Sequence, residues 1–144
     1  MKILVMNPNS TTSMTDKIVE SARQKASAGT TIIGASGTDS PASIQGHHDE
    51  ALSVPGLIKR LQQAEQEGID GVVVACFDDP GIGACREVFS GPVIGICEAA
   101  VKAASMISTS FSVVTTLPRS VPVIEDLIHG YGLSHRCRKV RSAA

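Results

Sequence analysis

The chain has 144 residues, carries a formal net charge of -1, and is 42% hydrophobic but only 3% aromatic. This length is enough for one compact α/β lobe, whose core must be filled by small apolar side chains because large aromatic ones are scarce. A charge so close to zero gives no basic field, which argues against nucleic acid or an anionic membrane as the partner. A small polar ligand is the better expectation.

The N-terminal apolar run from Ile3 to Met6 is too short for a signal peptide. No other apolar stretch is long enough to span a bilayer, so we expect a cytoplasmic protein without membrane association. The cysteines are widely and irregularly spaced without a CxxC pair, which predicts free thiols and neither a zinc site nor a redox motif. They are Cys76, Cys85, Cys97 and Cys137.

Short apolar runs alternate with helical patterns along the whole chain, which is typical of parallel strands joined by crossover helices. The three consecutive valines at 72–74 lack polar alternation, so their strand should be covered on both faces and central in the sheet. The expected strands are Lys2 to Met6, Thr30 to Ala35, Gly71 to Ala75, Pro92 to Ile96 and Phe111 to Thr116. The expected helices carry Met14 to Ala22, Leu52 to Leu61, Ala84 with Cys85, Glu98 to Ile107, and Pro122 to His129.

The rhythm of strands and helices restarts after residue 95, which predicts a division into residues 1–100 and 101–144. The first part should form an α/β lobe with a doubly wound, parallel, four-stranded sheet. The second part offers one strand, one helix and a basic stub after Gly130, which is too little for a sheet of its own. We therefore expect the chain to stop inside an incomplete second lobe.

Ligands bind beyond the carboxyl ends of the strands in open parallel sheets. The residues at these ends are unusually polar here, and one crevice could collect them all. Because the first of them are also ordinary turn formers, a role in the turn alone remains open. The segments are Asn7 to Thr11, Ser36 to Ser43, Cys76 to Asp79, Cys97 with Glu98, and Thr115 with Thr116.

Cys76 ends the central strand and precedes Pro80, Gly81 and the start of a helix. A helix N-terminus lowers the pKa of a nearby thiol from its usual value of roughly 8.5. The carboxylates of Asp78 and Asp79 have the opposite effect. The sequence leaves open which influence is larger, and a buried, inert thiol is the alternative to a reactive one.

The other three cysteines are weaker candidates. Cys85 lies inside a helical pattern and is expected to pack in the core. Cys97 stands at a strand end, where the neighbouring Glu98 disfavours the thiolate. Cys137 lies in the basic stub and is expected to be incidental.

Two further clusters suggest functions that the sequence does not favour. His47, His48, Asp49 and Glu50 are of metal-ligating types, but neighbouring side chains on a helix do not converge on one point, so no metal is expected. The charges of Arg136 to Arg141 lack aromatic neighbours, which favours a solvated tail over a nucleic-acid contact. The chain also lacks GxGxxG, P-loop and GxSxG motifs, which predicts a site without a cofactor.

Four segments, in order and with matching spacing, resemble the hydantoin racemases of the Asp/Glu racemase superfamily. Each segment alone is weak evidence, but together they are specific and extend over nearly the whole chain. They are Asn7 to Thr11 with Met14 and Thr15, Ala75 to Gly81, Gly91 to Ala100, and Val113 to Ser120.

The resemblance implies two similar α/β lobes with the active site between them and one catalytic cysteine from each lobe, of which Cys76 matches the first. One thiolate removes a proton from a 5-monosubstituted hydantoin and the other thiol returns one to the opposite face, as inversion requires. The ring carbonyls delocalise the carbanion as an enolate, so neither cofactor nor metal is implied. From position and motif match, the residues expected to hold the ring are Asn9, Ser10, Ser40, Ser43, Phe77, Asp78, Glu98, Thr115 and Thr116.

The second cysteine of the resembled family lies in a Gly-Cys-Ala-Gly type motif that this sequence does not contain, and the surroundings of Cys137 do not match it. We therefore expect impaired racemisation, from either a fragment or a short form that has lost the activity. The alternatives are an inactive racemase lobe and a racemase for allantoin or an acidic amino acid. The first lobe's strand-end loops offer no Arg or Lys to bind a carboxylate, which favours a neutral hydantoin ring as the small-molecule partner. A homo-oligomer is also expected.

Overall fold

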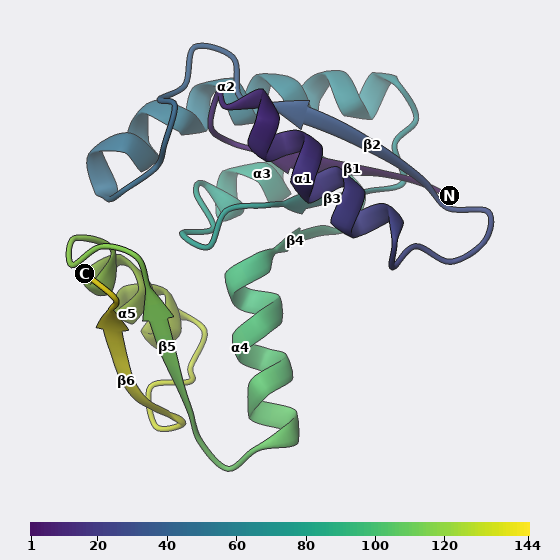
Figure 1. The fold of residues 1–144 in the computed structure, drawn as a ribbon. Coiled ribbons are helices and arrows are strands. Elements are labelled where there is room, and N and C mark those ends of the chain that lie inside the picture. The colour runs from purple at the N-terminus through teal and green to yellow at the C-terminus, as the bar shows by residue number, and fades with distance from the viewer.

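The computed structural model describes residues 1–144 and contains two parallel sheets joined by a helix (Figure 1). All five expected strands and all five expected helices are present, with bounds that differ by a few residues, and a sixth strand follows them. The strands are β1 Lys2–Asn7, β2 Thr31–Ser36, β3 Gly71–Val74, β4 Val93–Gly95, β5 Phe111–Thr115 and β6 Cys137–Ser142. The helices are α1 Thr12–Arg23, α2 His47–Gln66, α3 Ile82–Val88, α4 Ile96–Ile107 and α5 Ser120–Gly130.

The first sheet has the strand order β2-β1-β3-β4, and all of its neighbours are parallel. The four-stranded α/β lobe predicted from the sequence is therefore confirmed, with the valine-rich β3 inside the sheet. Helix α1 lies on one face, and α2 and α3 lie on the other (Figure 1). This winding brings the loops that follow β1, β2 and β3 to the same edge of the sheet.

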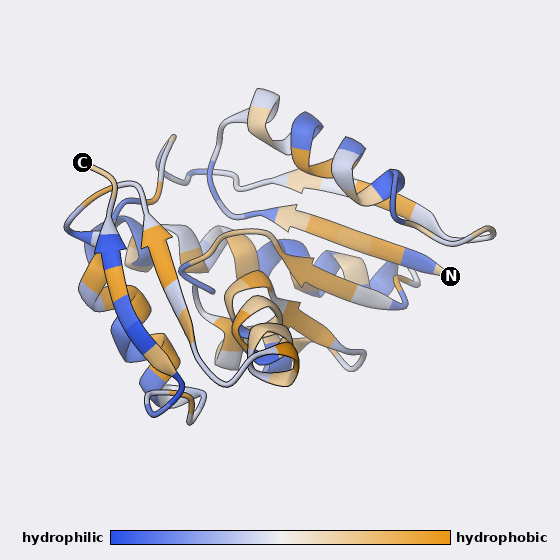
Figure 2. Ribbon diagram, turned by 60° about the horizontal axis from the view of Figure 1, so that its bottom comes forward, coloured by the Kyte–Doolittle hydropathy of each residue, from blue (hydrophilic) through white to orange (hydrophobic).

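The larger core lies between this sheet and the pair α2 and α3. Alternate residues of β1 and β3 face these helices, and both strands are strongly hydrophobic in Figure 2. Helix α2 contributes Leu57 and Leu61, which have no exposed surface. The buried members of this core are Leu4, Met6, Leu57, Leu61, Ala64, Ile69, Val72, Val74, Cys85, Phe89 and Val93.

The basic segment after Gly130 was expected to be a solvated tail, and the second part to be too short for a sheet of its own. Both expectations were wrong, because the segment forms β6 and pairs in parallel with β5. Helix α5 is the crossover that a parallel pair requires. Val140 is only 5% exposed and lies opposite Val113, while Arg138 and Lys139 both stay outside. A register irregularity between Phe111 and Ser112 breaks the alternation along the strand, and so the segment resembles a tail in the sequence.

Helix α4 leads from β4 to the second sheet and starts at Ile96, two residues earlier than expected. It packs a second, smaller core against α5 and the second sheet. The buried members of this core are Cys97, Val101, Ile124, Ile128 and Val140. The division into domains at residue 100 remains a prediction. None of the helices combines the length and apolar character that crossing a membrane requires.

Candidate active site

A cavity of about 370 Å³ lies between the loop that follows β3 and the end of β5. It contains Cys76 together with four of the residues predicted to hold a ligand, Phe77, Asp78, Thr115 and Thr116. The two sheets therefore contribute opposite walls. The neighbouring loop, β5 and the start of α5 supply three further lining residues that were not predicted from the sequence: Ile44, Val114 and Ser120.

Asn9 and Ser10, the predicted residues after β1, form hydrogen bonds that stabilise their own loop, and they do not line this cavity. Asn9 is only 6% exposed, and its side-chain oxygen accepts hydrogen bonds from the amide of Asn7 at 2.8 Å and from the backbone of Thr11 at 3.0 Å. The backbone N–H of Ser10 donates to the carbonyl of Pro41 at 3.0 Å. These bonds fix the turn beside the cavity.

Three other predicted residues also lie outside the cavity wall. Ser40 donates to the carbonyl of Thr38 at 3.4 Å, and Ser43 is exposed. The Glu98 carboxylate binds a lysine of its own helix and also Arg86, at 2.6 Å. The hydrogen bonds from these two cations hold the pKa of Glu98 below its usual range. Its charge is thus paired with Lys102 within α4 and with Arg86 of α3.

Burial raises the pKa of the Cys76 thiol to about 12, although the backbone N–H of Asp78 lowers it in part. The carboxylates of Asp78, Asp79 and Glu50 add to the increase because each repels a thiolate. The competition that the sequence left open is therefore decided by burial and by acidic neighbours. Cys76 holds its proton at neutral pH.

None of the other cysteines lines this cavity. Cys85 is fully buried in the larger core, which confirms its expected packing role. Cys97 is also fully buried, and burial followed by the nearby Asp79 carboxylate raises its pKa to about 12. Cys76 is accordingly the cysteine of residues 1–144 that a ligand in this cavity can meet.

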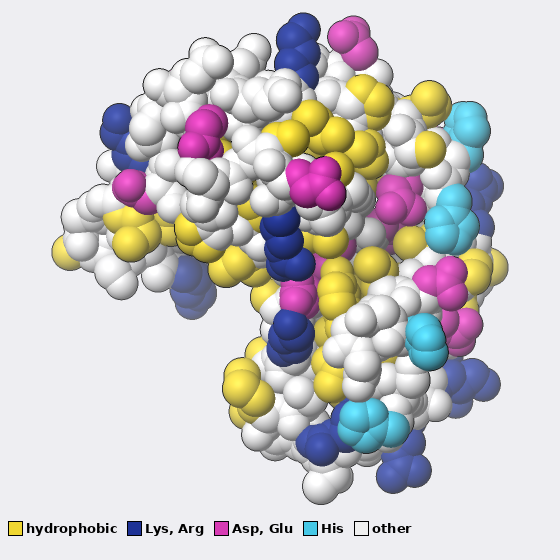
Figure 3. Space-filling model, turned by 180° about the vertical axis from the view of Figure 1, so that it is seen from behind, with side chains coloured by type: hydrophobic (Ala, Val, Ile, Leu, Met, Phe, Trp, Pro, Cys, Tyr) yellow, Lys and Arg dark blue, Asp and Glu magenta, His cyan; other side chains and the backbone are white.

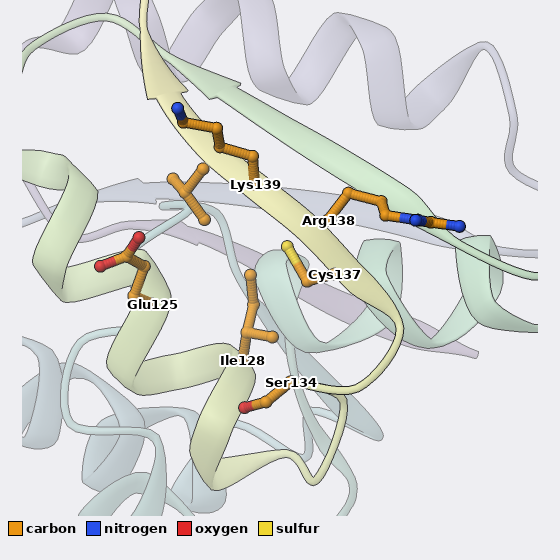
Figure 4. A pocket seen from close by; sticks show the side chains of 7 residues that line it. Glu125, Ile128, Ser134, Cys137, Arg138 and Lys139 are labelled. Carbon is orange, nitrogen blue, oxygen red and sulfur yellow. The ribbon is translucent and has the colours of Figure 1, made fainter.

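Cys137 lies at a separate, smaller cavity of about 150 Å³ between α5 and β6 (Figure 4). Its side chain is directed toward Ile128 of α5, and burial raises its pKa. This cysteine is part of the packing around the second core, and its expected lack of a functional role remains a prediction. The small cavity shares no lining residue with the Cys76 cavity.

The histidines at the start of α2 interact with their own helix. His47 lies 3.4 Å from Glu50, and His48 lies 3.4 Å from Asp49. The structure contains no group of three or more His, Cys, Asp and Glu side chains arranged to hold a metal ion.

Asp78 is 6% exposed, and its Oδ2 atom has no hydrogen-bond partner. Burial raises the pKa of this carboxyl to about 6, and repulsion by Glu50 adds to the increase, whereas His47 opposes it. The wall beside Cys76 therefore carries a carboxyl group that changes its charge near neutral pH.

We expect ionisation of Asp78 to destabilise the fold. Its folded pKa lies about two units above the unfolded value, so its contribution to stability is complete below about pH 4 and is lost as the pH rises through about 6. The loss amounts to up to about 3 kcal/mol. Urea denaturation followed by circular dichroism measures the free energy of unfolding. This free energy should decrease less from pH 4 to pH 7 in Asp78→Asn than in the parent. The matched control, Asp16→Asn in α1, should retain the parental slope; a parental slope in Asp78→Asn contradicts the prediction.

The sequence profile described as Asp/Glu/Hydantoin racemase matches residues 3–144. The chain belongs to the Asp/Glu/hydantoin racemase family. It is 56% identical over 142 residues to a hydantoin racemase from Rhizobium meliloti, covering 99% of this chain and 59% of that protein. It is 46% identical to a hydantoin racemase from a Pseudomonas species, strain NS671, covering 99% and 57%.

A solved structure of this racemase fold, the allantoin racemase from Klebsiella pneumoniae, superimposes with a TM-score of 0.97 at 42% identity. The match covers 99% of this chain and 58% of that one. The resemblance found in the four sequence segments is thereby confirmed at the level of the family and the fold. The chain spans somewhat more than half the length of the racemases that it matches.

Proposed function

We propose that residues 1–144 form the Cys76 half of a cofactor-independent racemase site for 5-monosubstituted hydantoins. The observation that carries this proposal is the cavity in which Cys76 faces the hydroxyl-bearing end of β5. Hydantoin and allantoin racemases among the relatives support the substrate class, because allantoin is a hydantoin with a ureido substituent at C5. The absence of Lys and Arg from the cavity wall favours a neutral ring over a free amino acid.

In the proposed reaction, the Cys76 thiolate takes the proton from C5 and becomes a thiol. The electron pair of the broken C–H bond moves into an enolate on the adjacent ring carbonyl, where the hydroxyl groups of Thr115 and Thr116 can donate to it. Return of the proton from Cys76 restores the original enantiomer. In the opposite direction of racemisation, the protonated Cys76 is the group that supplies a proton.

Inversion requires a second acid or base on the other face of the ring. No other cysteine of residues 1–144 lines the cavity, so we expect this chain to exchange the C5 proton with solvent while inverting few molecules. The second thiol of the two-cysteine mechanism belongs to the motif that these residues do not contain.

The test is to incubate one enantiomer of a 5-substituted hydantoin with the chain in deuterated buffer, and to follow deuterium at C5 by NMR together with optical rotation. We expect deuterium to enter faster than rotation is lost. Cys76→Ser should reduce exchange at least about 100-fold, the range over which a positioned acid or base acts. Cys137→Ser is the matched control, because that cysteine lies outside the cavity.

Exchange that survives Cys76→Ser would remove Cys76 from the reaction. Rotation that decays as fast as deuterium enters would show that a second acid or base is supplied within the chain or its assembly. Exchange no faster with the parent chain than in buffer without protein would support the alternative of a racemase fold without catalysis.

A further inference from the structure

Asp79 lies where three distant segments of the chain meet. It belongs to the loop between β3 and α3, three residues after Cys76, and is only 2% exposed. Its Oδ1 accepts a hydrogen bond from the backbone N–H of Cys97 at 3.0 Å, and its Oδ2 accepts one from that of Glu98 at 2.8 Å. The hydroxyl of Tyr131, directly after α5, donates to Oδ2 at 2.7 Å. One carboxylate thus ties the Cys76 loop to both α4 and α5.

The backbone is shaped to allow this contact. Asp79 has a φ of 41°, a conformation that is uncommon for residues other than glycine. Residue 95 is a glycine, and a Cβ there would overlap the Asp79 carboxyl group. The first N–H groups of a helix have no partner within the helix, and a carboxylate satisfies them especially well. The uncommon φ of Asp79 and the lack of a side chain at Gly95 therefore both serve the contact of the same carboxylate.

The contact also lies at the start of α4, the helix that joins the two sheets. Figure 3 shows basic and acidic side chains along the constriction between the upper and lower parts. A second polar side-chain link joins the loop after β2 to α5. It is the hydrogen bond from Ser120 to the carbonyl of Gln45, at 3.3 Å. The Asp79 contact involves a charged acceptor, so it is the stronger of these two links.

We propose that Asp79 is a positioning residue, which holds the Cys76 loop against α4 and α5 so that the thiol faces the β5 wall of the cavity. The inference rests on the proposed function for its catalytic consequence, but the contact can be tested without catalysis. Asp79 acts through the placement of Cys76 and is itself absent from the cavity wall. Small displacements of a reacting group can reduce rates about 100-fold.

Three variants separate this role from simple capping of α4. Tyr131→Phe keeps both backbone bonds of the cap and removes only the bond to α5. Asp79→Asn places an amide N–H₂ group where one of the backbone N–H donors needs an acceptor. Gly95→Ala displaces the carboxyl group without changing it. The matched control is Asp70→Asn, whose carboxylate accepts a hydrogen bond from the backbone of Lys2 at the opposite edge of the first sheet.

The four cysteines provide a readout that distinguishes local release from general unfolding. We expect all three variants to increase alkylation of Cys76 and Cys97 by iodoacetamide about tenfold, measured per residue by mass spectrometry of the full chain. Cys85, buried in the larger core, and Cys137, partly buried beside the second core, each lie within one part and should stay within about twofold of the Asp70→Asn control. A parallel increase at all four cysteines, or no increase at any, would overturn the proposal.

Exchange kinetics provide the catalytic half of the test. If Cys76-dependent exchange occurs in the parent, Tyr131→Phe should lower its kcat about tenfold or more with little change in KM, because the placement of the thiol is altered while the ring contacts remain. An unchanged kcat in both Tyr131→Phe and Asp79→Asn would overturn the proposal. If the parent shows no exchange, the proposed function fails, and the alkylation pattern alone decides whether Asp79 holds the loop.

Discussion

Cys76 should react with iodoacetamide at neutral pH about a thousand times more slowly than an unhindered thiol. Its pKa of about 12 lies about three units above that of a free cysteine, and only the thiolate reacts. Each pKa unit reduces the thiolate fraction tenfold at a fixed pH below both values. The alkylation rate at this residue therefore reports directly how strongly the site holds the proton.

The pH dependence separates this explanation from simple shielding of the sulfur. The rate for Cys76 should rise about tenfold per pH unit up to about pH 10 without reaching a plateau, because the thiolate remains a minority. Asp78→Asn should increase the rate, since it removes one of the repelling carboxylates. Protein unfolded in guanidinium is the control and should react at an ordinary rate. A plateau near pH 8 in the folded chain would mean that the thiolate is stabilised after all.

This result bears on which proton transfer Cys76 can perform. A thiol that retains its proton at neutral pH is ready to deliver it to an enolate. The same thiol is a poor base until substrate binding changes its surroundings, for example by neutralising Asp78, whose pKa of about 6 makes protonation easy. We therefore expect the exchange rate to increase with pH along with the alkylation rate.

The first sheet could be predicted because its information is local in the sequence. The uninterrupted valines of β3 indicate a strand covered on both faces, and the polar residues after it indicate a strand end. Both properties belong to a few consecutive residues. The position of Cys76 at the strand-end crevice could be predicted for the same reason, since this residue closely follows that strand.

Other features depend on contacts between distant residues. Strand β6 has basic residues at half of its positions and a register irregularity, so only its pairing with β5 across helix α5 makes it a strand. The bond between Asp79 and Tyr131 joins residues 52 positions apart and leaves no local pattern. In the loop after β1, a local pattern suggested a ligand contact that the structure does not contain. Asn9 has groups suited to a ligand, but its side-chain oxygen is hydrogen-bonded within its own turn. A position near a strand end therefore predicts where a site lies. It predicts less well which residues line that site.

Leu57→Ala should reduce the free energy of unfolding by about 3 kcal/mol, within the range of 2 to 5 kcal/mol found for buried leucines. Leu57 has no exposed surface and lies in the larger core between α2 and the first sheet, so its truncation leaves a cavity that close packing cannot readily fill. Leu52 is the matched control, since it lies on the same helix but is 52% exposed, and its change to alanine should alter stability by less than about 1 kcal/mol. Denaturant titration of both variants makes the comparison. Equal losses would mean that α2 does not pack on the sheet that carries Cys76 in the way described.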